Sequence, residues 1–141
     1  MEFTPSAGDE IQSEFFVARK DAPAAIAALE KIAPQINEIL WVTEIRAIAA
    51  DQLWMSPHYQ RDSIGIHFTW KKVDAVYEMV KVVEATLAPF GYRPHLGKVF
   101  SASPDYFKSV MPRFDDFKKL VAELDPTNKF GNEFTNRLMG L

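Results

Sequence analysis

Four polar side chains stand at two-residue spacing in strand-like segments of this sequence, and together they could do chemistry. Glu44 and Arg46 are two positions apart, and so are His67 and Thr69. A carboxylate and a hydroxyl bind ligands through hydrogen bonds, a neutral imidazole accepts a proton, and a guanidinium stabilises negative charge that develops on an oxygen atom. Lys98 follows further along the chain as a second cation that could join them. This mixture favours a binding or catalytic site.

The alternative interpretation is a solvated polar surface. Antiparallel sheets often leave one face in contact with water. On such a face Glu44 and Arg46 would form a surface ion pair that contributes well under ~1 kcal/mol. A plain wet face carries Lys, Glu and Thr, whereas here an imidazole is present and bulky side chains lie close by, at Trp41, Phe68 and Trp70. These features favour the site without excluding the surface.

Two histidines near a carboxylate raise the question of a metal centre. His67 and His95, with Glu44, could imitate the set of two histidines and one carboxylate that binds iron. The sequence has no HxH or HExxH spacing that would place ligands on one element. The cations Arg46 and Lys98 would also repel a metal ion. We therefore expect ordinary hydrogen-bonded histidines and no metal.

Strand patterns surround the candidate residues. Over residues 63–71, four large apolar residues alternate with smaller or polar ones, so the pattern has period two and predicts a strand with one apolar face. Similar patterns predict strands over residues 11–19, 39–48 and 92–100. Pro94 near the start of the last one indicates an edge strand or a late start.

Helical patterns fill the intervals between these strands. A first helix is predicted from residue 21, an aspartate N-cap, to Pro34, which should end or kink it. Residues 74–90 carry an apolar stripe at helical spacing. Short helices are predicted from residue 104 and over 113–124, before a tail. His58, in the connection between the second and third strands, is expected at the surface.

The order of the elements predicts the fold class. Strand, helix, strand, strand, helix, strand is the split β-α-β, or ferredoxin-like, pattern. It gives an α+β fold with an antiparallel sheet, helices on one face and short C-terminal helices. Because the helices must cover the apolar face, Glu44, Arg46, His67 and Thr69 are expected to project together from the other face. We expect a flexible arm over residues 1–10 and a single domain over residues 11–141.

Composition excludes several classes of protein. The 141 residues fit one domain, and the net charge of -3 gives no basic surface for nucleic acid. The absence of cysteine rules out disulfides, thiol catalysis and cysteine-bound zinc. No apolar stretch approaches the ~18 residues of a membrane span, and the N-terminal residues do not resemble a secretion signal. We expect a cytoplasmic protein without membrane or nucleic-acid partners.

Several longer segments resemble the C-terminal part of xylitol and alditol oxidases. They are residues 13–19 (SEFFVAR), 41–70 with the motifs TEIR and HFTW, 93–100 (RPHLGKVF) and 124–134 (LDPTNKFGNEF). These enzymes stand with the aldonolactone oxidases, D-arabinono-1,4-lactone oxidase among them, in the vanillyl-alcohol oxidase class of flavoproteins. The resemblance runs from about residue 11 to residue 137, with the motifs in the order and spacing of the family.

The resemblance implies an activity and a role for each candidate residue. The family oxidises an alcohol group of a polyol such as xylitol or sorbitol through FAD and passes the electrons to O2, which gives H2O2. Glu44 and Thr69 would bind polyol hydroxyls. Arg46 would lie near the flavin and the reacting hydroxyl, Lys98 would contact substrate and flavin, and His67 would support the substrate or relay a proton.

The resemblance also implies a partner. The family joins an N-terminal FAD-binding domain to a C-terminal substrate domain, whose sheet lies over the flavin ring. This chain has no GxGxxG or GxxxxGK[ST] loop to cradle phosphates. The FAD-binding domain is therefore expected to be absent, and the chain to be inactive alone. The alternative is a stand-alone ligand-binding or dimerisation module without catalysis. An uncovered sheet face could also form a homo-oligomer.

Overall fold

A four-stranded antiparallel sheet forms the centre of the protein. The structure, a computed structural model, describes residues 8–140. The strands are β1 (Glu10–Ala18), β2 (Leu40–Ile48), β3 (Ser63–Lys71) and β4 (Arg93–Pro94). They lie in the order β2-β3-β1-β4. The strands that are first and third in the chain are therefore central, as the split β-α-β pattern requires.

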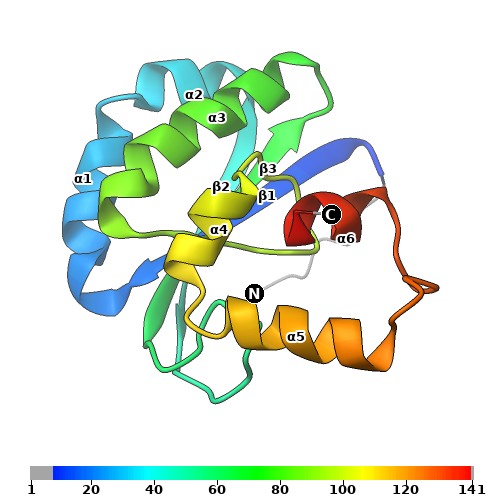
Figure 1. Ribbon diagram of the computed structural model, residues 1–141. Helices are drawn as coiled ribbons and strands as arrows, with labels where there is room; N and C mark the ends of the chain where they lie inside the picture. Colours follow the sequence, from blue (N-terminus) through cyan, green and yellow to red (C-terminus); the bar gives the residue numbers. More distant parts are fainter. Residues whose placement is uncertain (1–7, 141) are drawn as a thin grey trace.

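The helices form two groups (Figure 1). The first group is α1 (Ala22–Glu30), α2 (Ala33–Ile39) and α3 (Ala75–Leu87), which lie side by side against the sheet. The second group is α4 (Pro104–Val110), α5 (Phe114–Leu124) and α6 (Glu133–Met139). The predicted α+β class and antiparallel sheet are confirmed.

The core lies between the sheet and the first group of helices. Alternate residues of β1 and β3 enter it, and α3 contributes residues at helical spacing. The buried side chains include Phe15, Val17, Ile66, Phe68, Trp70, Val76, Val80, Val83 and Leu87. Within this core the indole Nε1 of Trp70 donates to Ser13 Oγ at 2.9 Å, so its one polar group is paired.

The fourth strand is shorter than predicted. The sequence predicts residues 92–100, whereas β4 covers Arg93–Pro94. After β4 the amide of His95 still donates to the Glu14 carbonyl, and the amide of Val99 donates to the Gln12 carbonyl, both at 2.9 Å. Between these two bonds the chain turns, with the Lys98 amide bonded to the His95 carbonyl. The turn interrupts the strand because it takes residues 96–98 out of the ladder.

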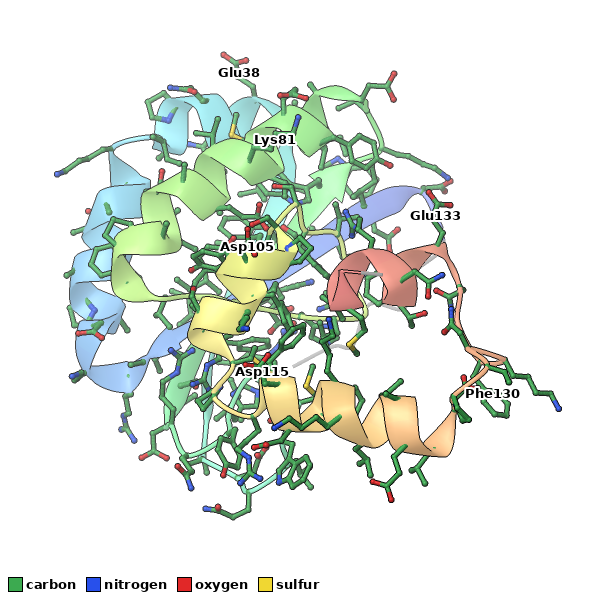
Figure 2. All side chains as sticks on the ribbon, in the orientation of Figure 1. Glu38, Lys81, Asp105, Asp115, Phe130 and Glu133 are labelled. Carbon is green, nitrogen blue, oxygen red and sulfur yellow. The ribbon has the colours of Figure 1, made fainter. Side chains whose placement is uncertain are left out.

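Two other segments differ in detail from the prediction. Pro34 does follow the end of α1, but it also stands in the first turn of α2, where a missing amide costs nothing. The predicted tail contains α6, which begins at a capping box between Asn132 and Thr135. Phe130, in the loop before α6, projects away from the body of the molecule (Figure 2).

The ends of the chain complete the description. The arm predicted over residues 1–10 lies mostly outside the described residues, and Glu10 already belongs to β1. Within residues 8–140, no helix combines the length and the apolar character that crossing a bilayer requires.

Candidate active site

The predicted polar residues lie on the sheet face that points away from α1 and α3, here called the open face. In the register of the sheet, His67 on β3 stands between Glu44 on β2 and Glu14 on β1. Directly opposed residues of neighbouring strands share a face. Arg46 and Thr69, two residues away along their strands, share this face too.

Five side chains on the open face form a continuous series of contacts. Lys98 Nζ donates to Glu14 Oε2 at 2.7 Å, and Arg46 Nη1 donates to Glu14 Oε1 at 3.1 Å. The second guanidinium nitrogen of Arg46 donates to Glu44 Oε2. The same oxygen of Glu44 lies 3.1 Å from His67 Nδ1. The series therefore alternates cation and carboxylate before it ends at an imidazole.

A glycine makes room for the central contact of this series. Arg46 on β2 and Phe16 on β1 both pair with Gly65 on β3, which lies between them. A Cβ atom at Gly65 would lie 3.0 Å from the Phe16 ring and 3.1 Å from Glu14 Oε1. Because Gly65 has no side chain, Glu14 and Arg46 can meet over the strand that separates them.

Glu14 is a buried anion with two cationic partners. Its side chain is only 6% exposed, whereas those of Arg46 and Glu44 are 45% and 49% exposed. Burial acts to raise the pKa of Glu14, but the hydrogen bond and charge of Lys98, followed by the charge of Arg46, outweigh it and lower the pKa. Glu14 is therefore ionised at neutral pH.

His67 is held as a neutral imidazole. Burial, and next the charge of Lys98, lower its pKa below the ordinary value of about 6.5. The carboxylate of Glu44 accepts a hydrogen bond, so the ring proton lies on Nδ1, an assignment that follows from this contact. Nε2 then carries a lone pair, and it has no hydrogen-bond partner among the residues that the structure describes.

Thr69 and Lys98 are placed by different elements. Thr69 lies on β3, opposite Gln12 of β1, and its hydroxyl makes no hydrogen bond to another of the described residues. Lys98 comes from the turn after β4, which brings it beside β1. Both residues share the open face with His67, as predicted, although Thr69 is outside the series of contacts.

An open pocket of about 360 Å³ lies beside these contacts on the open face. Two of its lining residues, Glu14 and Arg46, also belong to the series of contacts. The other lining residues are Phe16, Ile48, Pro57, His58, His95, Leu96 and Gly97. His58 is half-buried against the Phe16 ring, with ring centroids 4.5 Å apart, so the expectation of a surface residue was wrong. The loop that carries His58 is held against the body of the protein, because Arg93 Nη1 donates to the carbonyls of Pro57 and Tyr59.

The histidines do not gather around a common point. Within residues 8–140, no three His, Cys, Asp or Glu side chains form a group suited to a metal ion. Burial lowers the pKa of His95 and of His58, so these imidazoles are neutral as well.

Sequence reasoning missed Glu14 and Gly65. Both stand in strands that were predicted, at positions that face away from the helices. The signal for Glu14 was a single acidic residue among the apolar ones of SEFFVAR, on the opposite phase to Phe15 and Val17. Its importance depends on partners 32 and 84 residues away, which the sequence does not reveal.

The fold and the open face define a class of protein, an α+β domain with a cluster of charged and hydrogen-bonding side chains on one face of its sheet. Comparison with known proteins identifies the family. The sequence pattern of D-arabinono-1,4-lactone oxidase matches residues 9–138, and the chain belongs to this family.

Individual relatives support this assignment. The chain is 41% identical over 139 residues to an alditol oxidase of a Streptomyces species, which covers 98% of the chain and 34% of that oxidase. It is 24% identical over 133 residues to the L-gulono-1,4-lactone dehydrogenase of Mycobacterium tuberculosis, which covers 92% of the chain and 30% of that enzyme. The mouse L-gulonolactone oxidase is 28% identical over 99 residues, which covers 67% of the chain and 22% of the enzyme. The chain thus spans between 22% and 34% of the length of these relatives.

Proposed function

We propose that this chain is the substrate-side domain of an FAD-dependent oxidase that acts on a polyol or a sugar lactone. The observation that carries the proposal is the series of contacts from Lys98 to His67 on the open face. These residues lie within residues 9–138, which match the D-arabinono-1,4-lactone oxidase family. They supply hydrogen-bond acceptors, fixed cations and a neutral base within one surface, which alcohol oxidation requires.

The charge of the site favours a substrate without net charge. The cations of Arg46 and Lys98 are balanced by the carboxylates of Glu14 and Glu44, and His67 is neutral. A sugar phosphate or a sugar acid would need an uncompensated cation, because burying an unpaired charge is costly. A polyol or a lactone needs only donors and acceptors, such as the Thr69 hydroxyl and the half-exposed Glu44 carboxylate.

His67 would accept the proton of the alcohol once a substrate reaches its Nε2 atom, which is buried in this structure. Its Nδ1 proton is engaged by Glu44, so Nε2 is the basic atom of the ring. A neutral imidazole with a carboxylate behind it is a general base whose orientation and tautomer are fixed. Arg46 and Lys98 would stabilise the negative charge that develops on the oxygen as the proton leaves.

When bound, FAD would supply the acceptor for the hydride of the alcohol carbon. The open face fits this group in one respect, since it offers two cations and an apolar pocket wall on a surface that α1 and α3 leave uncovered. Arg46 and Lys98 would contact the flavin ring. The sequence contains no phosphate-binding glycine loop, so the phosphates would be held by the flavin-binding part of the parent enzyme.

Exposed apolar side chains support a large partner at the edge of the sheet. Trp41 and Ile45 on β2 are 55% and 56% exposed, and Leu53 in the following loop is 70% exposed. Exposed apolar side chains on an edge strand can mark an interface. The flavin-binding part would cover them. A second copy of the chain is the alternative occupant, and light scattering of the 141-residue chain would reveal it as a dimer.

A chimera tests the proposed activity. The 141 residues would replace the matching segment of the Streptomyces alditol oxidase, and H2O2 production would be measured with xylitol. We expect xylitol-dependent H2O2, and a loss of about 100-fold in kcat/KM for Arg46→Met, because one electrostatic contact to the developing charge is removed.

Lys108→Met is the matched control. Lys108 forms an exposed ion pair with Asp115 on the C-terminal helices, so its loss should leave the rate unchanged. An Arg46→Met chimera that keeps the parental rate would contradict the assignment of the site. A well-folded chimera that never responds to a polyol or a lactone would contradict the proposed function.

A further inference from the structure

One buried carboxylate joins the two cations of the open face. Oε1 of Glu14 accepts from Arg46 at 3.1 Å and Oε2 accepts from Lys98 at 2.7 Å, so each oxygen has its own cation. Arg46 belongs to β2, at one edge of the sheet, and Lys98 follows β4, at the other edge. Among residues 8–140, Glu14 is thus the one group that both cations contact.

We propose that Glu14 is a positioning residue that fixes both cations on the open face, Lys98 directly and Arg46 across the gap at Gly65. The inference deepens the proposed function, and its link to catalysis rests on that function. Ordering a long side chain such as Lys or Arg costs rotamer entropy. A flexible cation therefore holds one geometry only when a partner restrains it and so offsets this cost. A carboxylate that is buried and bound on both oxygens provides this restraint.

A second buried carboxylate shows what a purely structural role looks like. Glu84 on α3 is as buried as Glu14, but it accepts from the backbone amides of Ser101 and Ala102 at 2.9 and 3.3 Å. Glu84 therefore links the loop at residues 101–102 to α3. Glu14 accepts instead from two side-chain cations. Because their partners differ, Glu14 holds functional side chains in place, whereas Glu84 holds the backbone of a loop.

Glu14 also acts on His67 through its charge. The negative charge of Glu14 raises the pKa of His67, while Lys98 and Arg46 lower it, after burial, which has the largest effect. Glu44 contributes a hydrogen bond that raises it. If Glu14 becomes neutral, the two cations are less compensated, and the pKa of His67 should fall further.

The test compares Glu14→Gln with Glu84→Gln in the 141-residue chain by NMR. Glutamine keeps the shape but has one acceptor oxygen, and its amide group would face the other cation. We expect Glu14→Gln to abolish the slowly exchanging ammonium signal of Lys98 or the hindered guanidinium signal of Arg46, and to shift the titration of His67 to lower pH. Glu84→Gln should lower the thermal midpoint but change none of these signals. Lys98→Met and Arg46→Met assign the signals.

Gly65→Val provides a second arm in case Glu14→Gln does not fold. Its methyl groups would fill the gap. The guanidinium signal of Arg46 should therefore be lost, while the ammonium signal of Lys98 persists. The proposal is overturned if Glu14→Gln folds and leaves both cation signals and the His67 titration as in the parent, or if Gly65→Val retains the Arg46 signal. Neither outcome depends on turnover, so an inactive chimera would contradict the proposed function but not the positioning role.

Discussion

Glu14 on β1 and Arg46 on β2 are bonded at 3.1 Å although β3 lies between their strands. Side-chain pairs in sheets normally join adjacent strands. This pair spans three strands because Gly65 leaves the middle position empty. Its geometry therefore depends on the register of both strand pairs at once, since a slip of one residue would turn one partner to the other face.

The gap at Gly65 predicts an unusual response to alanine. In an unobstructed strand, Gly→Ala stabilises by about 0.5–1 kcal/mol. At Gly65 a Cβ would lie 3.0 Å from the Phe16 ring and 3.1 Å from Glu14 Oε1, so Gly65→Ala should destabilise by roughly 1 kcal/mol. Urea unfolding measures the difference. Gly97→Ala is the control, because its Cβ would meet only the His95 ring edge, at 3.3 Å. A Gly65→Ala variant more stable than the parent would mean that the gap is not needed.

The charge of Lys98 predicts the titration of His67. After burial, Lys98 has the largest effect in lowering the pKa of His67. Lys98→Met removes a positive charge and should therefore raise the pKa of His67, the opposite of the shift expected for Glu14→Gln. Proton NMR of the imidazole measures both. Lys71→Met, at the far end of β3, should leave the titration unchanged. Shifts in the same direction for Lys98→Met and Glu14→Gln would contradict this electrostatic account.

The histidines predict how stability depends on pH. The pKa values of His58, His67 and His95 are all lowered in the folded protein, chiefly by burial. As the pH falls below about 6.5, the unfolded chain binds protons before the folded one, so stability should decrease. The lowered pKa of Glu14 adds a further loss in more acidic solution, as the pH falls through its folded value.

Urea midpoints at pH 7.5, 6.5 and 5.5 measure this dependence. The midpoint should fall with pH, and His67→Gln should reduce the slope because one of the three groups is removed. A midpoint that is higher at pH 5.5 than at pH 7.5 would show that the imidazoles gain protons on folding, contrary to their burial.

The buried hydrogen bond between Trp70 and Ser13 predicts that removing the Ser13 hydroxyl will destabilise the fold. Ser13→Ala would leave the indole N–H of Trp70 without its partner in the core, at a cost of roughly 1–3 kcal/mol. The matched control is Ser109→Ala on the exposed side of α4, which should change the free energy of unfolding by no more than about 0.5 kcal/mol. Tryptophan fluorescence during urea unfolding reports both. Equal midpoints for the two variants would mean that Ser13 Oγ does not satisfy the indole.

The fold was largely predictable because its signals are local. The alternation in residues 63–71 became β3 with the bounds predicted, and the stripe in residues 74–90 became α3. The predicted fourth strand was too long because the chain turns inside it. The Lys98 amide bonds to the His95 carbonyl, and this turn, which contains Gly97, interrupts the ladder to β1.

By itself the sequence determined that Glu44, Arg46, His67 and Thr69 share one face, because side-chain direction alternates along a strand. It placed Lys98 inside a fourth strand over residues 92–100, whereas the structure puts Lys98 in a turn after β4. Only the tertiary structure decided that Arg46 and Lys98 meet through Glu14. That contact requires β1, β2 and the turn after β4 to come together, with a glycine beneath the crossing. Periodicity fixes the direction of a side chain, whereas the identity of its neighbours depends on strand order and register, which are set by the packing of the whole chain.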